Sequence, residues 1–364
     1  MTDSYLLLQN TISSIRAADK IAVQKAAEYQ SHLAMPPDSM GQVLKIGQKL
    51  AGITGCIKNS LPKKRIIVLC ADNGIVEEGV SSAPQSVTAK QAVNMTKFLT
   101  GMSSLAHHFG NEVQVVDLGI KCPYQCKEIL NKNIRRGTSS FLKGAAMTRE
   151  EALQALVTGI GLADQAKNEG VSVIGVGEMG IGNTTTSTAV LSVLCGVSPE
   201  KITGRGGVIT DEMLFHKKEV IKKGIELNKP EKDDILDVLS KVGGLDIAAM
   251  CGLYLGAAAN KIPAVIDGYI SAVGALCAVR FSENVRDYLF PSHSSQEAGC
   301  KIAMEELSLQ PYLNLEMRLG EGSGCPFAFQ IMEGACVLMN DMATFEKADI
   351  NDSYLDQVRE EFKK

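Results

Sequence analysis

The sequence lacks any apolar run long enough to cross a bilayer. The most apolar stretches, at 245–262 and 263–279, are interrupted by Asp246 and Asp267, whereas a transmembrane helix needs about 20 mostly apolar residues. Near the N-terminus there is only a three-leucine run, which is far shorter than the apolar core of a signal peptide. We therefore expect no membrane segment and no secretion signal.

An excess of positive charge is also missing. The 37 Lys and Arg residues are balanced by 41 Asp and Glu residues, which gives a formal net charge of -4. Such a chain has no general attraction to nucleic acid or to anionic membranes. The composition predicts a globular protein with small-molecule partners, no nucleic-acid partner and no membrane partner.

Metal-binding and disulfide patterns are absent. The five histidines show no H-x-x-x-H or H-E-x-x-H spacing, and the pair Cys122 and Cys126 has no second pair nearby. The ten cysteines run from Cys56 to Cys336 without a compact framework, which is typical of free thiols in a reducing compartment. We expect no metal site and no cofactor, and we expect a cytoplasmic location.

Four short apolar runs, rich in β-branched residues, are the strongest local signals. They are RIIVLCA at 65–71, VQVVDLGI at 113–120, VSVIGVG at 171–177 and PAVI at 263–266. Runs that are apolar on both faces suit a parallel sheet covered on two sides. YLNLEMRLG at 312–320 alternates more, and we count it as a fifth candidate strand.

Helical patterns separate these runs. Thr148 and Glu151 form a capping box before an amphipathic stretch that ends near Gly170, and small-residue helices are expected at 184–195 and 246–259. The alternation predicts an α/β fold with a mostly parallel sheet and helices on both faces, Rossmann-like.

The ends of the chain carry helical patterns without strong strands. A chain of 364 residues exceeds the size at which one core usually stops growing. We expect residues 61–329 to form a large α/β catalytic domain, and residues 1–60 and 330–364 to form a small helical domain.

The stretch VSVIGVGEMGIGNTTTSTAV, 171–190, resembles two phosphate motifs without fulfilling either. Asn183 stands where a P-loop has its lysine, which argues against an NTPase. A dinucleotide-binding motif requires an acidic residue about twenty positions later, at the end of a strand. Glu200 lies at that distance, but it follows Ser198 and Pro199 and does not end a strand. A loop of free amides that opens into a hydroxyl-rich helix start suits a single phosphate ester.

The loop GEGSG, 320–324, presents one carboxylate between glycines. Flanking glycines allow the backbone to approach a ligand, and partial burial would raise the pKa of Glu321 toward that of a general base. An ordinary turn with an exposed glutamate explains the same residues equally well.

Together these motifs resemble one family closely. GVGEMGIGNTTTST, DNGIVEEGVSSAPQSVTAKQAVNM, GRGGVITDEMLFHKK, DGYISAVGALCA and RLGEGSG are similar to sequences of the nicotinate-nucleotide:5,6-dimethylbenzimidazole phosphoribosyltransferase family, which makes the lower-ligand nucleotide of cobamides. The resemblance covers about 35–342. It implies a glycosyltransferase that acts on nicotinate mononucleotide and an aromatic base, working as a homodimer whose active site can borrow residues from the partner.

The resemblance also implies roles for individual residues. Glu321 matches the catalytic base, Gln85 a glutamine of the base pocket, and Lys217 a position near the phosphate or carboxylate, while Glu178 lies near the nicotinate or the base. The remaining residues expected to bind substrate are Ser82, Gly177, Gly180, Gly182, Asn183, Thr184, Thr185, Gly320 and Gly322.

Three segments depart from the family pattern and leave the acceptor open. They are MPPDSMG at 35–41, where KPPGSLG is common, Asn73 in place of the histidine of DHG, and QEAGC at 296–300, where AEPGH is usual. The alternatives are a relative that uses phenol or p-cresol, as one half of a heterodimer with a paralogue, a silent nucleotide-binding subunit and a Rossmann oxidoreductase. Because Glu321, Gln85 and the phosphate loop follow the benzimidazole pattern, we predict 5,6-dimethylbenzimidazole or benzimidazole as the acceptor.

Overall fold

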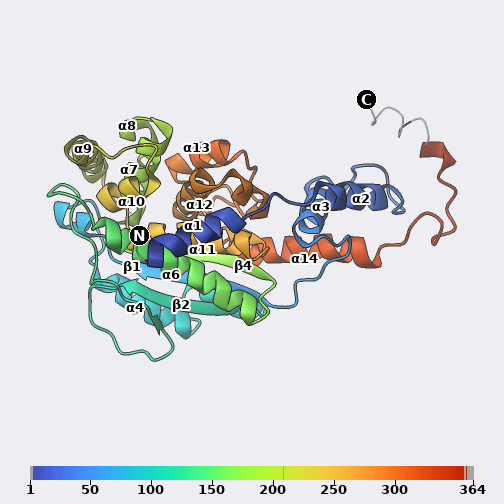
Figure 1. Ribbon diagram of the computed structural model, residues 1–364, viewed down its shortest axis with the longest axis horizontal. Helices are drawn as coiled ribbons and strands as arrows, with labels where there is room; N and C mark the ends of the chain where they lie inside the picture. Colours follow the sequence, from blue (N-terminus) through green and yellow to red (C-terminus); the bar gives the residue numbers. More distant parts are fainter. Residues whose placement is uncertain (1–2, 208, 356–357, 359–364) are drawn as a thin grey trace. The chain divides into compact units, whose positions relative to one another are not determined.

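The computed structural model describes residues 3–207, 209–355 and 358. The chain forms two compact units. The larger unit contains residues 3–16 and Lys63–Ala328, and the smaller unit contains Ala17–Pro62 and the described residues from Phe329 onward. Figure 1 shows the course of the chain through both.

A parallel sheet of six strands, in the order β3-β2-β1-β4-β5-β6, forms the centre of the larger unit. The strands are β1 (Lys64–Ala71), β2 (Glu112–Gly119), β3 (Leu130–Asn131), β4 (Val173–Met179), β5 (Ala264–Ile266) and β6 (Leu289–Pro291). The first four predicted strands are confirmed as β1, β2, β4 and β5. Every residue of β4 is buried, as expected for a strand covered on both faces.

Helices surround this sheet. In the larger unit they are α1 (Asp3–Ser14), α4 (Ser86–Thr96), α5 (Gly101–His108), α6 (Arg149–Asn168), α7 (Asn183–Cys195), α8 (Pro199–Ile202), α9 (Asp211–Asn228), α10 (Ile235–Val242), α11 (Leu245–Ala259), α12 (Tyr269–Phe281) and α13 (Ala298–Leu307), with 3-10 turns η1 (Gly74–Glu78) and η2 (Glu283–Tyr288). The capping box of α6 is confirmed, since Thr148 and Glu151 bond each other's backbone amides.

Successive strands are added on one side of β1 first and on its other side afterwards. The chain passes from β1 to β2 on one side and later returns to β4 on the other. Right-handed crossovers then place α4 and α5 on one face and α11 and α12 on the opposite face (Figure 1). In open parallel sheets, such a switch point is where ligands bind, beyond the carboxyl ends of the strands.

Close packing of α6 on α11 depends on glycines. A Cβ at Gly159 would lie 2.0 Å from the Ala249 carbonyl oxygen, and one at Gly252 would lie 1.8 Å from the Leu156 carbonyl oxygen. The backbones of the two helices therefore approach more closely than any side chain would permit. Residues Leu245 to Ala258 of α11 are all buried, which makes this helix the centre of the core.

The predicted fifth strand at 312–320 is wrong. Apart from a single bridge between Leu313 and His293, this segment has no regular structure. The fifth place in the sheet is taken by β6, a three-residue strand too short to show a pattern, and β3 adds a two-residue edge. The alternation of apolar and polar residues along 312–320 therefore occurs in a segment that has no strand beside it to pair with.

The smaller unit is helical. It contains α2 (Lys20–Ser31), α3 (Gln42–Thr54), the 3-10 turn η3 (Ser353–Leu355) and most of α14 (Cys325–Asp341), within which the boundary falls. Ala26, Ala51 and Met339 form its buried cluster.

Helix α1 belongs to the larger unit, where it packs against α6 and α11, whereas residues 1–60 were expected in the helical domain. The sequence of an amphipathic helix does not reveal which of two surfaces the helix will cover.

Within the described ranges, no helix combines the length and apolarity that a bilayer crossing requires.

Candidate active site

Polar residues gather where the parallel strands end. Asn73 follows β1, Glu178 lies near the end of β4, Asp267 follows β5, and the loop 320–324 packs against this edge. Parallel strands bring residues that are far apart in sequence to the same edge of the sheet. A cavity of about 300 Å³ opens there, between β4, α12 and the loop that carries Glu321.

Glu321 is held in an uncommon backbone conformation. Its φ is 63°, in the left-handed region, and its neighbours Gly320 and Gly322 have φ values of 78° and 89°. A non-glycine residue in this region costs free energy and is often found at functional sites. The Glu321 side chain lines the cavity.

The carboxylate of Glu321 is shielded from solvent, with an exposure of 6%. Its Oε1 accepts a hydrogen bond of 3.3 Å from Nε2 of Gln91. Its buried Oε2 accepts no hydrogen bond of normal geometry, although the Thr100 hydroxyl lies near enough to stabilise the charged carboxylate. Burial raises the pKa of Glu321, and the Thr100 hydroxyl and the Gln91 amide oppose this rise only in part. A buried carboxylate with one oxygen that lacks a hydrogen bond of normal geometry is suited to accept a proton.

Glu178 connects this loop to the glycine-rich turn after β4. Its Oε1 accepts from the Glu321 amide at 3.3 Å, and its Oε2 accepts from Nδ2 of Asn183. Burial, followed by the charge of Asp246, raises the pKa of Glu178 to about 8. A carboxyl group with this pKa is largely protonated at neutral pH and can donate a hydrogen bond as well as accept one.

The glycines of this turn allow the backbone segments to approach one another. A Cβ at Gly177 would meet the Glu321 carbonyl oxygen at 2.6 Å, one at Gly180 would meet the Ala71 carbonyl oxygen at 2.0 Å, and Gly182 has a φ of 97°. These residues are therefore required by tight packing at the strand ends. Of the three, Gly180 lines the cavity.

The expectation that this turn offers a row of free amides is wrong for four positions. The Ile181 amide donates to the Thr88 hydroxyl at 3.1 Å, and the Thr186 amide donates to the Gly182 carbonyl at 3.4 Å. The Asn183 amide donates to the Gly180 carbonyl at 3.1 Å, and the Thr185 amide donates to the Gly182 carbonyl at 3.0 Å. The tight turn satisfies three of these four donors internally as α7 begins. The hydroxyl of Thr185 is buried without a hydrogen-bond partner.

Lys217 supplies a buried positive charge beside the start of α7. It is 1% exposed, and its Nζ donates to Oγ1 of Thr184 at 2.8 Å and to the Gly204 carbonyl at 3.3 Å. Burial lowers the pKa of Lys217 to about 8, against the opposing charge of Glu297. An ammonium group behind a threonine hydroxyl at a helix N-terminus favours an anionic ligand group.

The structure brings only part of the predicted set together around the cavity. Six predicted residues line it, namely Glu178, Gly180, Asn183, Thr184, Gly320 and Glu321. Five other predicted residues lie outside the lining: Gly177 in β4, Gly182 in the turn, Thr185 in α7, Lys217 in α9 and Gly322 in the loop. Ser82 and Gln85 are not part of the lining either, and the Gln85 side chain donates to the Asn73 carbonyl at 3.3 Å.

Several lining residues were missed by the sequence analysis. Gln91 contacts Glu321 directly. Other lining residues with polar side chains that were missed are Asp267, Tyr269, Ser271, Ser295, Glu297 and Arg318. Gln91 lies six residues after Gln85 in the same motif. It lies within α4, whereas Gln85 occupies the position just before that helix. The sequence analysis predicted no helix there, and the start of this helix is the signal that would have distinguished the two glutamines.

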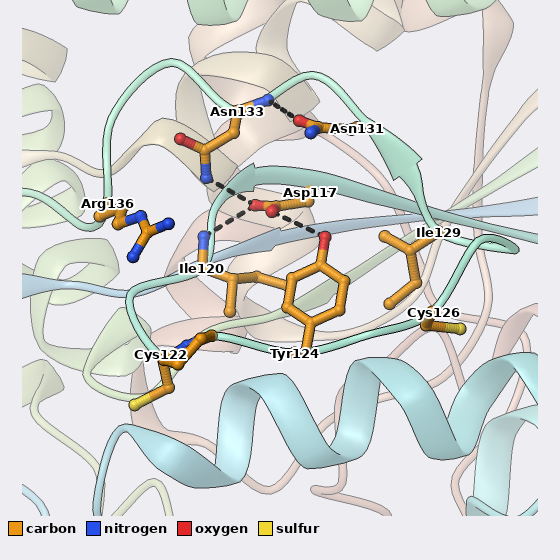
Figure 2. A pocket seen from close by; sticks show the side chains of 10 residues that line it. Asp117, Ile120, Cys122, Tyr124, Cys126, Ile129, Asn131, Asn133 and Arg136 are labelled. Atoms are coloured by element: carbon orange, nitrogen blue, oxygen red, sulfur yellow. Dashed lines mark hydrogen bonds between the residues drawn. The ribbon is translucent and has the colours of Figure 1, made fainter.

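A second cavity, of about 450 Å³, lies at the end of β2 (Figure 2). Asp117 occupies its centre, and both of its carboxylate oxygens are engaged: Oδ1 accepts from the Ile120 amide and from Nδ2 of Asn133, and Oδ2 accepts from the Tyr124 hydroxyl. Asp117 thus holds the loop that follows β2.

Among the described residues, no group of three or more His, Cys, Asp or Glu side chains could hold a metal ion.

Comparison with known proteins identifies the family. A family model described as phosphoribosyltransferase matches residues 15–350. The chain is 47% identical to nicotinate-nucleotide–dimethylbenzimidazole phosphoribosyltransferase of Clostridium tetani, over 97% of this chain and 98% of that protein. It is 48% identical to the protein of the same name from Clostridium acetobutylicum, over 94% and 97%.

A solved structure agrees with these relatives. The crystal structure of nicotinate-nucleotide-dimethylbenzimidazole phosphoribosyltransferase from Thermus thermophilus superposes with a TM-score of 0.87 at 33% identity, covering 92% of this chain and 100% of that chain. The fold, the matched family model and these relatives show that the chain belongs to the phosphoribosyltransferase family.

Proposed function

We propose that this enzyme transfers the 5-phosphoribosyl group of nicotinate mononucleotide to 5,6-dimethylbenzimidazole or a similar base. The products are α-ribazole 5′-phosphate and nicotinate. The proposal rests on one observation above all: Glu321, on a left-handed loop, lines a cavity whose other wall is the β4–α7 turn. The relatives from Clostridium tetani and Clostridium acetobutylicum, which are named for this reaction, support it.

The anionic end of the nucleotide is assigned to the start of α7. Thr184 lines the cavity there, and the Lys217 ammonium lies 2.8 Å behind its hydroxyl. A phosphate ester in this place gains a hydrogen bond from the hydroxyl and attraction from both the ammonium and the helix dipole. No divalent metal is needed for this arrangement.

The transfer itself exchanges one C–N bond for another. The bond between C1′ of the ribose and nicotinate breaks, and its electron pair stays on the pyridine nitrogen, which leaves neutral and needs no proton. The lone pair of the acceptor nitrogen attacks C1′ from the opposite face, which inverts β to α.

Glu321 is proposed as the general base. As the acceptor nitrogen bonds to C1′, positive charge develops on the base, and its N–H proton passes to the Glu321 carboxylate and then to water. Proton transfer by a positioned side chain contributes about 10²–10⁴-fold to the rate. Gln91, which donates to Oε1 of Glu321, leaves Oε2 to receive the proton.

Replacing Glu321 with Gln tests this assignment. The substitution keeps the shape of the side chain and removes its basicity, so we expect kcat to fall by about 10²–10⁴-fold while the nucleotide still binds. Glu316→Gln is the matched control, because the same change is made five residues away on an exposed side chain. Near-normal turnover in Glu321→Gln would remove Glu321 from its proposed role.

The acceptor is decided by competition. A benzimidazole attacks through one nitrogen and loses its proton from the other, so the base and C1′ must lie on opposite sides of it. A phenol attacks through the oxygen that carries its proton. With equal concentrations of 5,6-dimethylbenzimidazole and p-cresol we expect the N-linked nucleotide to dominate, and a mixture dominated by the O-linked product would overturn the acceptor assignment but not the reaction.

The assembly and location remain proposals. We propose a homodimer in the cytoplasm, with a small helical domain built from Ala17–Pro62 and the described residues from Phe329 onward. Ten free cysteines support a reducing compartment. Light scattering of the purified chain tests the dimer, and a monomer at micromolar concentration would contradict it.

A further inference from the structure

A buried carboxylate outside the predicted set holds the loop that carries Glu321. Asp267 follows β5 and is 1% exposed. Its Oδ2 accepts from the Gly322 amide at 3.0 Å, and its Oδ1 accepts from the Gly324 amide at 2.6 Å. One side chain therefore bonds two backbone amides of a five-residue loop, on the C-terminal side of Glu321.

The loop needs such an anchor. Three consecutive residues, Gly320, Glu321 and Gly322, have left-handed backbones, and a strained conformation persists only where the surroundings hold it. Within the loop, the Ser323 amide donates to the Gly320 carbonyl at 2.9 Å. The amides of Gly322 and Gly324 donate to Asp267, and that of Glu321 donates to Glu178 in β4. Asp267 therefore accepts two of these three hydrogen bonds, which makes it the main polar anchor of the loop.

Both polar backbone groups of Asp267, its amide and its carbonyl, are hydrogen-bonded to side chains. Its amide donates to Oγ of Ser271 at 3.2 Å, and its carbonyl accepts from Oγ of Ser292 at 2.6 Å. These two serines belong to α12 and to the residue after β6. The position of the Asp267 carboxylate is therefore set by the sheet and not by the loop it holds.

The hydrogen bonds of Asp267 favour this role over that of a second proton carrier, because loop amides occupy both of its carboxylate oxygens. Burial raises the pKa of Asp267 to about 7, and the Gly324 and Gly322 amides oppose the rise because they stabilise the charged form. His293 lies 3.8 Å away, and burial lowers its pKa to about 4, so it is neutral. By contrast, Oε2 of Glu321 accepts no hydrogen bond of normal geometry.

We infer that Asp267 is a positioning residue for the general base: it acts on the reaction through Glu321, by fixing the Gly322 and Gly324 amides. The inference rests on the proposed role of Glu321. Removal of one of these bonds should let the loop shift, and a misplacement of about 1 Å at a reacting group can cost about 10²-fold in rate.

The test is a double-mutant cycle between Asp267→Asn and Glu321→Gln. Asparagine has the shape of aspartate, but its amide nitrogen cannot accept from a backbone amide. In the wild-type background we expect Asp267→Asn to lower kcat by about 10²-fold, with KM for nicotinate mononucleotide within about threefold. In the Glu321→Gln background the same substitution should lower kcat by no more than about threefold, because residues that act as a unit are not additive.

Asp117→Asn is the matched control. Asp117 is also a buried aspartate near the end of a strand, and it also binds a backbone amide, but the loop it holds carries no part of the cavity with Glu321. We expect kcat within about threefold of wild type, and the same small effect in the Glu321→Gln background.

The outcomes separate the claims. Equal losses from Asp267→Asn in both backgrounds, or a kcat within threefold of wild type, would overturn the inference and leave the proposed function intact. No loss in Glu321→Gln alone would overturn the proposed function instead. If Asp267→Asn does not fold, Ser292→Ala enters the same cycle: it removes one hydrogen bond to the Asp267 carbonyl, and a kcat loss of about fivefold should vanish without Glu321.

Discussion

We expect Gly177→Ala to lower the turnover rate, although the added methyl group would contact no substrate. Gly177 lies in β4 directly beneath the loop that carries Glu321, and a Cβ at this position would lie 2.6 Å from the Glu321 carbonyl oxygen. Ordinary van der Waals contact begins near 3.4 Å, so the loop must retreat by about 0.8 Å. The contacted atoms are backbone, which cannot rotate away as the end of a flexible side chain can.

The size of the effect follows from this displacement. A shift of about 1 Å at a reacting group costs about 10²-fold in rate, and overpacking of a buried site costs about 1–3 kcal/mol of stability. We expect kcat to fall by about 10²-fold and the thermal midpoint to drop by several degrees. Because α9 and the start of α7 are not displaced, KM for nicotinate mononucleotide should change by less than about threefold.

Steady-state kinetics and thermal melting of one preparation decide the matter. Gly161→Ala is the control, since a Cβ on this exposed helical glycine meets nothing within 4 Å; it should keep wild-type kcat and gain about 0.5–1 kcal/mol of stability. Wild-type turnover in Gly177→Ala would refute the reasoning, because it would show that the position of the loop does not govern the rate.

Further predictions concern pH, metal and packing. The pKa of Lys217 is about 8, so its charge is present below that pH and lost above it; KM for nicotinate mononucleotide should rise above pH 8, and a flat KM up to about pH 9.5 would remove Lys217 from phosphate binding. Burial raises the pKa of Glu321, so kcat/KM should fall as pH drops through a value above the ordinary value of about 4.3 for a glutamate, and an acid limb below that value would contradict the assigned base. Activity should survive EDTA, and a loss restored by Mg²⁺ would contradict the metal-free phosphate site. Gly252→Ala places a Cβ 1.8 Å from the Leu156 carbonyl oxygen and should lower stability by at least about 1–3 kcal/mol in denaturant titration, whereas an unchanged midpoint would show that α6 and α11 can separate freely.

Local pattern was enough to find the main elements of the fold. The strands β1, β2, β4 and β5 are short apolar runs rich in β-branched residues. The start of α6 is marked in the sequence by a capping box. These signals are local because strand burial and helix capping act over a few residues. The alternation of strands and helices then implied a parallel sheet, and hence a site at the carboxyl ends of its strands.

Strand pairing was decided only by the tertiary structure. β6 has three residues and becomes a strand because β5 lies beside it, while 312–320 alternates in sequence but finds no strand to pair with. A short strand gains its hydrogen bonds from a neighbour, so its own residues carry little information about its existence.

The site shows the same division. Glu321 was recognisable because its flanking glycines report a special backbone at that position, and Asn183 because it replaces a lysine within a motif. Gln91 carries no such mark, and Asp267 is marked only by its position directly after a predicted strand. Their contacts with the Glu321 loop join residues 230 and 55 or more positions apart in sequence, and they exist because parallel strands and the helix after β1 deliver distant residues to one edge of the sheet. The residue proposed as the base could therefore be singled out from the sequence, while the groups that hold its loop in place were decided by the fold.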